Sequence, residues 1–246
     1  MITIVSGLLP CLDRERRESA WLDFAKLLRA TGLPLVLYGE PSLLVKVDAG
    51  ARGGLGPLVL RSIDEDTVRG GLWLHDNLQA LAELSGHAPD ERLARMARLR
   101  AMGWLHDESI YNPHGSKSFV WVDPLLLDEV QPAYLACGGP LSMIEPLLDP
   151  LLLLSRSDCG DGQAFSEALF GGTSDRLSLV NHAYWQVYAQ MLCQREIPSF
   201  SSVMAMLWQA LPGSMQRFNL QSNGLAGAFF EAVSGGPISL EFLHTA

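Results

Sequence analysis

The stretch that decides the fold runs Ser116-Lys117-Ser118-Phe119-Val120-Trp121-Val122-Asp123-Pro124. The apolar run at 119–122 predicts a central strand that is buried on both faces of a sheet. Pro124 has no backbone N–H to give to a neighbouring strand, so the strand is expected to end at Asp123. In an open α/β sheet, ligands bind beyond the carboxyl ends of the strands. Asp123 is therefore the first candidate for a functional side chain.

Short apolar strands and amphipathic helices alternate along the rest of the chain. The patterns predict further strands at 2–6, 35–38, 43–47, 58–60 and 151–154. They predict helices at 14–31, 72–84, 89–102, 125–135, 141–148, 176–195 and 201–211. Alternation of this kind is typical of an α/β fold with a mostly parallel central sheet flanked by helices. No linker or internal repeat divides the sequence, so residues 1–246 are expected to form a single domain that ends in a glycine-rich tail.

Composition and charge narrow the classes of protein. Hydrophobic residues make up 48% and charged residues 18% of the 246 positions, which is typical of a chain that folds around a core. The formal net charge of -9 would repel a polyanion unless basic groups gathered on one face. The charge therefore disfavours a nucleic-acid partner. The shares of hydrophobic and charged residues also exclude a disordered or fibrous protein.

Targeting and cysteine patterns indicate a cytoplasmic protein. No basic residue precedes the first apolar run, so a secretory signal peptide is not expected. The most apolar stretch, 141–154, is interrupted by acidic residues and prolines and is shorter than the roughly 20 residues that span a bilayer. We therefore expect no membrane span. The four cysteines form no CxxC pair, which argues against a zinc knuckle or a dithiol redox site.

The order of these features resembles the HtrL/YibB (WlaTC) family of bacterial glycosyltransferase-like proteins. The likeness rests on the Ile-Thr-Ile-Val start, the strand that ends in Tyr38, and the helix end at Arg98–Arg100. It also rests on three further motifs, Tyr111-Asn112-Pro113, Phe119-Val-Trp-Val-Asp123 and Phe170-Gly-Gly172. The resemblance covers most of the chain. It implies a GT-A-like, Rossmann-like fold and transfer of a sugar from a nucleotide-sugar donor to an acceptor that remains unknown.

The same resemblance implies roles for individual residues. Asp123 would hold a divalent metal, Mn²⁺ or Mg²⁺, in the place of the family's Asp-x-Asp element. Arg100 would meet the diphosphate of the donor, and Gly171 and Gly172 would line the sugar pocket. The catalytic group is not assigned by the likeness.

Two departures from the family pattern leave a second interpretation open. Asp-Pro-Leu follows the strand where the family has Asp-Ala-Gly, and Ser199–Ser202 stands where an acidic pair is expected at a helix start. Loss of that carboxylate is typical of a catalytically impaired binding or scaffold protein. A third hypothesis, transfer to a base in modified DNA, has only the arginine-rich helix at 89–102 in its favour.

Each candidate residue also has a structural interpretation. Asp-Pro commonly begins a turn, so Asp123 is equally explained as a turn former. Arg100 lies on an arginine-rich helix whose charged residues are typical of a solvated face. As a ligand, Asp123 would be exposed to a cleft and unpaired; as a turn former, it would accept backbone hydrogen bonds.

Overall fold

The computed structural model describes residues 1–7, 14–50, 56–63, 89–123, 145–156 and 164–220. These residues form one seven-stranded sheet in the order β3-β2-β1-β4-β6-β5-β7. The strands are β1 (Ile2–Gly7), β2 (Leu35–Gly39), β3 (Leu58–Ser62), β4 (Ser118–Val122), β5 (Leu151–Arg156), β6 (Ala164–Thr173) and β7 (Met215–Leu220). The helices are α1 (Arg14–Ala30), α2 (Pro41–Gly50), α5 (Pro89–Tyr111), α8 (Ser174–Cys193) and α9 (Phe200–Ala210), with a 3₁₀ helix η2 (Glu145–Leu148).

The sheet is mostly parallel. Strand β1 pairs in parallel with β2 and β4, β2 with β3, and β5 with β7. Among the described strands, β6 alone runs opposite to the others. It lies between β4 and β5 and is antiparallel to both. This arrangement confirms the mostly parallel α/β sheet that the alternating sequence predicts.

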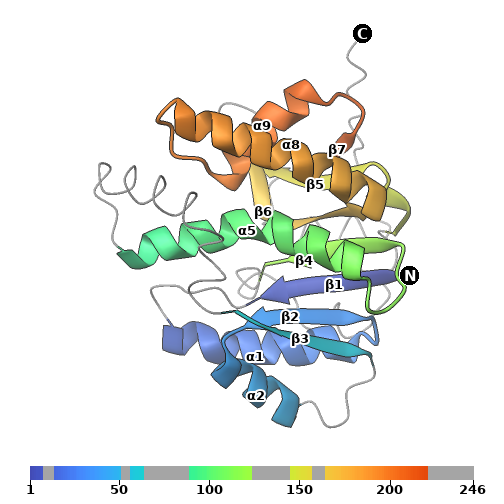
Figure 1. Ribbon diagram of the computed structural model, residues 1–246. Helices are drawn as coiled ribbons and strands as arrows, with labels where there is room; N and C mark the ends of the chain where they lie inside the picture. The colour runs from blue at the N-terminus through green and yellow to red at the C-terminus, as the bar shows by residue number, and fades with distance from the viewer. Residues whose placement is uncertain (8–13, 51–55, 64–88, 124–144, 157–163, 221–246) are drawn as a thin grey trace.

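Helices cover both faces of the sheet (Figure 1). On one face, α1 and α2 bring Trp21, Phe24 and Leu43 against alternate residues of the strands, such as Ile4 and Val120. On the other face, α5, α8 and α9 pack on the residues between, and this second core includes Val5, Tyr38, Trp121 and Phe170. Strands buried on both faces read as continuous apolar runs, which explains why 119–122 stands out in the sequence.

The strand predicted at 43–47 is wrong, because these residues belong to α2. Leu43, Leu44 and Val47 are buried while Val45 is 67% exposed, which is the spacing of a helix face rather than of a strand. Pro41 stands at the first position of α2, where a missing N–H costs nothing. The backbone N–H groups of Leu43 and Leu44 both bond to the carbonyl oxygen of Glu40.

The remaining expectations differ in their outcomes. The strands at 2–6, 35–38, 58–60, 119–122 and 151–154 are confirmed, as are the helices that begin near 14, 176 and 201. Helix α5 begins at Pro89 as predicted but continues to Tyr111, and the strands β6 and β7 were not predicted. The helices predicted at 72–84 and 125–135, and the first half of 141–148, lie outside the described residues. The second half of 141–148 forms η2.

Candidate functional site

The order of the strands places a topological switch point between β1 and β4. From β1 the chain passes through α1 to β2 on one side, and it returns through α5 to β4 on the other side of β1. The two connecting helices lie on opposite faces of the sheet. Ligands of open α/β sheets bind outside the carboxyl ends of the strands at such a point.

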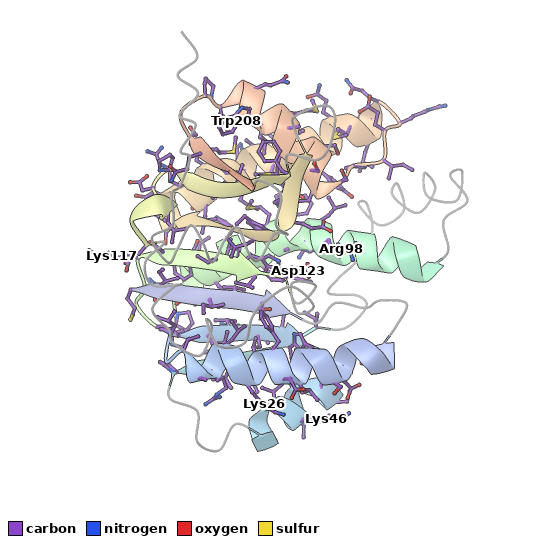
Figure 2. All side chains as sticks on the ribbon, turned by 180° about the vertical axis from the view of Figure 1, so that it is seen from behind. Lys26, Lys46, Arg98, Lys117, Asp123 and Trp208 are labelled. Carbon is purple, nitrogen blue, oxygen red and sulfur yellow. The ribbon has the colours of Figure 1, made fainter. Side chains whose placement is uncertain are left out.

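Asp123 stands at this switch point (Figure 2). Val5 of β1 pairs with Trp121 of β4, so the residues two positions further along the two strands are Gly7 and Asp123. The buried hydroxyl of Ser6 donates a hydrogen bond of 2.6 Å to the carbonyl oxygen of Val122, which fixes the two strand ends to each other. The position expected for Asp123 from the sequence is therefore the position it has.

The environment of Asp123 differs from that expected for a ligand in an open cleft. The residue is 3% exposed, and its side chain or backbone has an interaction partner in the fold. A buried carboxylate requires such a partner, because an isolated charge away from water is costly. Gly7 beside it has little room for a side chain, since an ideal Cβ would lie 3.0 Å from Cβ of Tyr38 and the neighbouring residue would have to move.

A bulge in β6 lies next to the carboxyl end of β4. Along β5 the pairing moves one residue, from Leu153 to Leu154, while the partner on β6 moves from Phe170 to Ser166. The extra residues therefore loop out of the β5–β6 ladder where Leu169 pairs with Val122, immediately before Asp123. Bulges are over-represented beside active sites, where they redirect side chains.

The bulge presents a second carboxylate, Glu167. Its Oε1 lies 3.4 Å from Nε of Arg98 on α5, and the two side chains are 34% and 32% exposed. Glu167 is not among the residues predicted from the sequence. Phe165 and Phe170 are both buried in the core under α5, α8 and α9, although their odd separation would place them on opposite faces of a regular strand. Their shared face shows that the alternation of β6 is broken between them, in agreement with the register shift.

Arg100 lies on α5 and faces α8 rather than β6. Its guanidinium carbon is 5.8 Å from the centre of the Trp185 ring, a cation–π contact, and its Nε is buried without a hydrogen-bond partner among the described residues. Burial lowers the pKa of Arg100 below its ordinary value, and the carboxylate of Asp107 opposes this shift. The structure records no contact that joins Arg100 to Asp123.

Gly171 and Gly172 lie inside the sheet. Gly171 pairs with Val120 and Gly172 with Phe119, so both are separated from Asp123 along β4. A Cβ on Gly171 would lie 2.4 Å from the carbonyl oxygen of Phe119, and one on Gly172 would lie 2.9 Å from Cδ1 of Leu151. Close approach of backbone and side chains explains both glycines without a ligand. Their role in a sugar pocket stays a prediction.

The serines at the start of α9 cap the helix. The hydroxyl of Ser199 accepts from the backbone N–H of Ser202, and the hydroxyl of Ser202 accepts from the N–H of Ser199 at 2.9 Å. This reciprocal pair is a capping box, and it satisfies two N–H groups that a helix start leaves without partners. Ser201 also accepts from the N–H of Phe165 at 2.9 Å, which joins α9 to the start of β6.

A second polar cluster joins β2, β3 and α5. The fully buried carboxylate of Glu108 accepts from the hydroxyl of Tyr38 at 2.7 Å and from Nε of Arg61 at 2.7 Å. Nη2 of Arg61 donates to the other oxygen of Glu108 at 3.2 Å, and its guanidinium lies over the Tyr111 ring. Burial, and then the bond to Glu108, raise the pKa of Tyr38 well above its ordinary value. Every strong polar group in this cluster has a partner from the protein, which is typical of a structural network.

Two kinds of feature are absent from the described residues. No three His, Cys, Asp or Glu residues in that part of the chain come together as ligands for a metal ion. No helix there has the length and apolar content needed to cross a membrane.

The known proteins that this chain is similar to are solved structures. No model of a protein family matches the chain, and no curated protein matches it in sequence. Among solved structures, the chain is similar to mouse xyloside xylosyltransferase 1 in its apo form, with 12% identity, a TM-score of 0.46, and coverage of 95% of this chain and 93% of that one. It is also similar to core-mannan synthase A from Aspergillus fumigatus in its Mn/GDP form, with 10% identity, a TM-score of 0.44, and coverage of 88% and 72%.

Proposed function

We propose that this protein is a glycosyltransferase of the GT-A type that uses a nucleotide-sugar donor, and that it belongs with the HtrL/YibB (WlaTC) family. The observation that carries the proposal is the position of Asp123. It follows β4 at the switch point of the sheet, beside the end of β1. Nucleotide ligands of α/β sheets bind at this place, and a carboxylate there suits a metal-assisted diphosphate site.

The proposal includes a hard divalent cation, Mn²⁺ or Mg²⁺, for which Asp123 would supply a carboxylate ligand. Such ions prefer oxygen ligands, and Mg²⁺ is usually held by one or two protein carboxylates together with substrate phosphates. Alternation along β4 puts Asp123 on the face of Trp121. Trp121 belongs to the core under α5, α8 and α9, so Asp123 lies on the α5 side of the sheet. When bound, the cation would neutralise the diphosphate as it leaves the sugar.

The protein's own residues would orient the donor. In this proposal Asp123 anchors the diphosphate end through the cation, and Arg100 supplies a positive group for the phosphates. Gly171 and Gly172 remain proposed sugar contacts on the resemblance alone. Because their packing is already explained within the sheet, Asp123 is the residue on which the proposal depends.

Calorimetry with nucleoside diphosphates tests this function directly. The full chain is titrated with a panel of nucleoside diphosphates, with and without MnCl₂, while circular dichroism confirms that it is folded. We expect one or more nucleotides to bind, and binding to weaken when Mn²⁺ is removed. A folded protein that binds none of them at millimolar concentration contradicts the proposal.

A catalytically impaired binding or scaffold protein is the second candidate. The first turn of α9 has no acidic residue, and Ser199 and Ser202 are engaged with each other as a cap. This candidate predicts nucleotide binding without turnover, or no nucleotide binding. Release of nucleoside diphosphate from a nucleotide sugar by the purified protein would exclude it.

A further inference from the structure

We infer that Glu167 is the general base of the proposed transfer reaction, and that Arg98 is a positioning residue that holds it. The inference rests on the proposed function and adds to it the group that removes the acceptor's proton. The resemblance assigned no residue to this task, and the expected acidic pair is replaced by Ser199–Ser202.

The bulge in β6 brings Glu167 to the right edge of the sheet. Leu169 pairs with Val122, so a regular ladder would place Asp123 opposite the next residue of β6, with Glu167 one position beyond. The register shift between Leu153 and Leu154 interrupts the β5–β6 pairing at the residues of β6 that include Glu167. The contact with Arg98 shows that the Glu167 side chain reaches α5, on the same side of the sheet as Phe165.

Exposure separates the roles of the two carboxylates. Asp123 is 3% exposed, whereas the side chain of Glu167 is 34% exposed. A base must be reached by the acceptor hydroxyl or by water, and of the two only Glu167 is partly open to solvent. The guanidinium of Arg98, with its Nε 3.4 Å from Oε1, restrains the carboxylate without sealing it, because Arg98 is itself 32% exposed.

Transfer of the sugar requires no reagent other than the donor and the acceptor. The acceptor oxygen attacks C1 of the donor sugar, and the bond from C1 to the phosphate oxygen breaks with its electron pair leaving on the nucleoside diphosphate. The acceptor proton passes to a carboxylate oxygen of Glu167, and the new C1–oxygen bond forms. A base positioned in this way contributes typically 100- to 10,000-fold to the rate.

Two measurements on the same variants test the inference. Nucleoside diphosphate binding with MnCl₂ is measured by calorimetry, and turnover is measured as nucleoside diphosphate released from a panel of nucleotide sugars, with water as acceptor. For Glu167→Gln, which keeps the size of the side chain, we expect binding within about twofold of the parent and turnover lower by about 100-fold or more. Asp23→Asn is the control, because Asp23 pairs with Lys26 on the exposed surface of α1.

Arg98 variants test the positioning role. Arg98→Lys keeps a positive charge beside Glu167 and should retain most turnover, whereas Arg98→Gln should lose about tenfold or more, in kcat rather than in KM. A Glu167→Gln variant that turns over within threefold of the parent overturns the inference and leaves the proposed function intact. A parent that binds nucleotide without turnover also overturns it, in favour of the binding protein. A parent that binds no nucleotide removes the proposed function and the inference together.

Discussion

The hydroxyl of Tyr38 donates a hydrogen bond of 2.7 Å to Oε1 of Glu108 and so joins β2 to α5. Glu108→Ala would leave this buried hydroxyl without a partner, at a cost of about 1–3 kcal/mol in the free energy of unfolding. Loss of the Arg61 contact would add little to this cost, because the Arg61 side chain is 36% exposed and can hydrogen-bond to water instead. Tyr38→Phe, which leaves the Arg61–Glu108 pair intact, should cost only about 0.5–1.5 kcal/mol. Urea denaturation measures both, and equal losses would contradict a network centred on Glu108.

Two glycines should respond to alanine in opposite directions. A Cβ on Gly171 would meet the backbone of β4, 2.4 Å from the carbonyl oxygen of Phe119, so Gly171→Ala should destabilise by about 1–3 kcal/mol or more. Gly103 lies inside α5, where the nearest atom to a new Cβ is Cζ2 of Trp185 at 3.5 Å. Gly103→Ala should therefore stabilise by about 0.8–1 kcal/mol, the helix preference for alanine. Melting midpoints compare the two, and a Gly171→Ala protein as stable as the parent would refute the close β4–β6 approach.

The capping box of α9 gives a prediction about Ser199. Ser199→Ala removes the acceptor for the N–H of Ser202 and should cost about 0.5–2 kcal/mol. Ser199→Asp keeps an acceptor at the cap, so it should retain most of the stability that alanine loses. Denaturant midpoints for the three proteins provide the measurement. If the Ser199→Asp protein were no more stable than the Ser199→Ala protein, the Ser199 hydroxyl would have a role other than capping the helix.

Asp107 should make stability depend on pH. Burial raises the pKa of Asp107, and this outweighs the opposing effects of His106 and Arg100. The folded protein therefore holds the Asp107 proton more tightly than the unfolded chain, and the associated stability is lost as pH rises through the raised pKa. Asp107→Asn should raise the melting midpoint at pH 7 relative to the parent and make little difference at pH 3. The effect is small because the side chain is 51% exposed, and melting midpoints of the two proteins at both pH values measure it.

Asp123→Asn distinguishes a ligand from a turn former. If Asp123 anchors the donor, the dissociation constant for nucleoside diphosphate with Mn²⁺ should rise by about tenfold or more. The melting midpoint should then fall by no more than about 2–4 °C, which corresponds to about 1 kcal/mol for a domain of this size. Asp23→Asn is again the control. A loss of about 0.5–2 kcal/mol with nucleotide affinity unchanged would instead identify a structural turn residue.

The sequence by itself determined the elements that local patterns encode. The apolar run before Asp123 is buried on both faces, and the sequence Asp-Pro after it predicts the strand end, so the strand and its end could be read without any knowledge of neighbours. The helix start at Pro89 followed from similarly local features. The strand predicted at 43–47 failed because a short apolar run fits a buried strand and a buried helix turn equally well. Pro41 was the local feature that favours the helix.

Only the tertiary structure decided which strand ends meet and which side chains reach them. The reversal of β6 and its bulge bring Glu167 to Arg98, residues that are far apart in the chain. The same packing faces Arg100 toward Trp185 and gives Ser199 its cap partner. The register between strands depends on burial against distant elements, and a shift of one residue moves every side chain to the other face. Periodicity within one segment carries no information about that register, which is why Asp123 could be predicted and Glu167 could not.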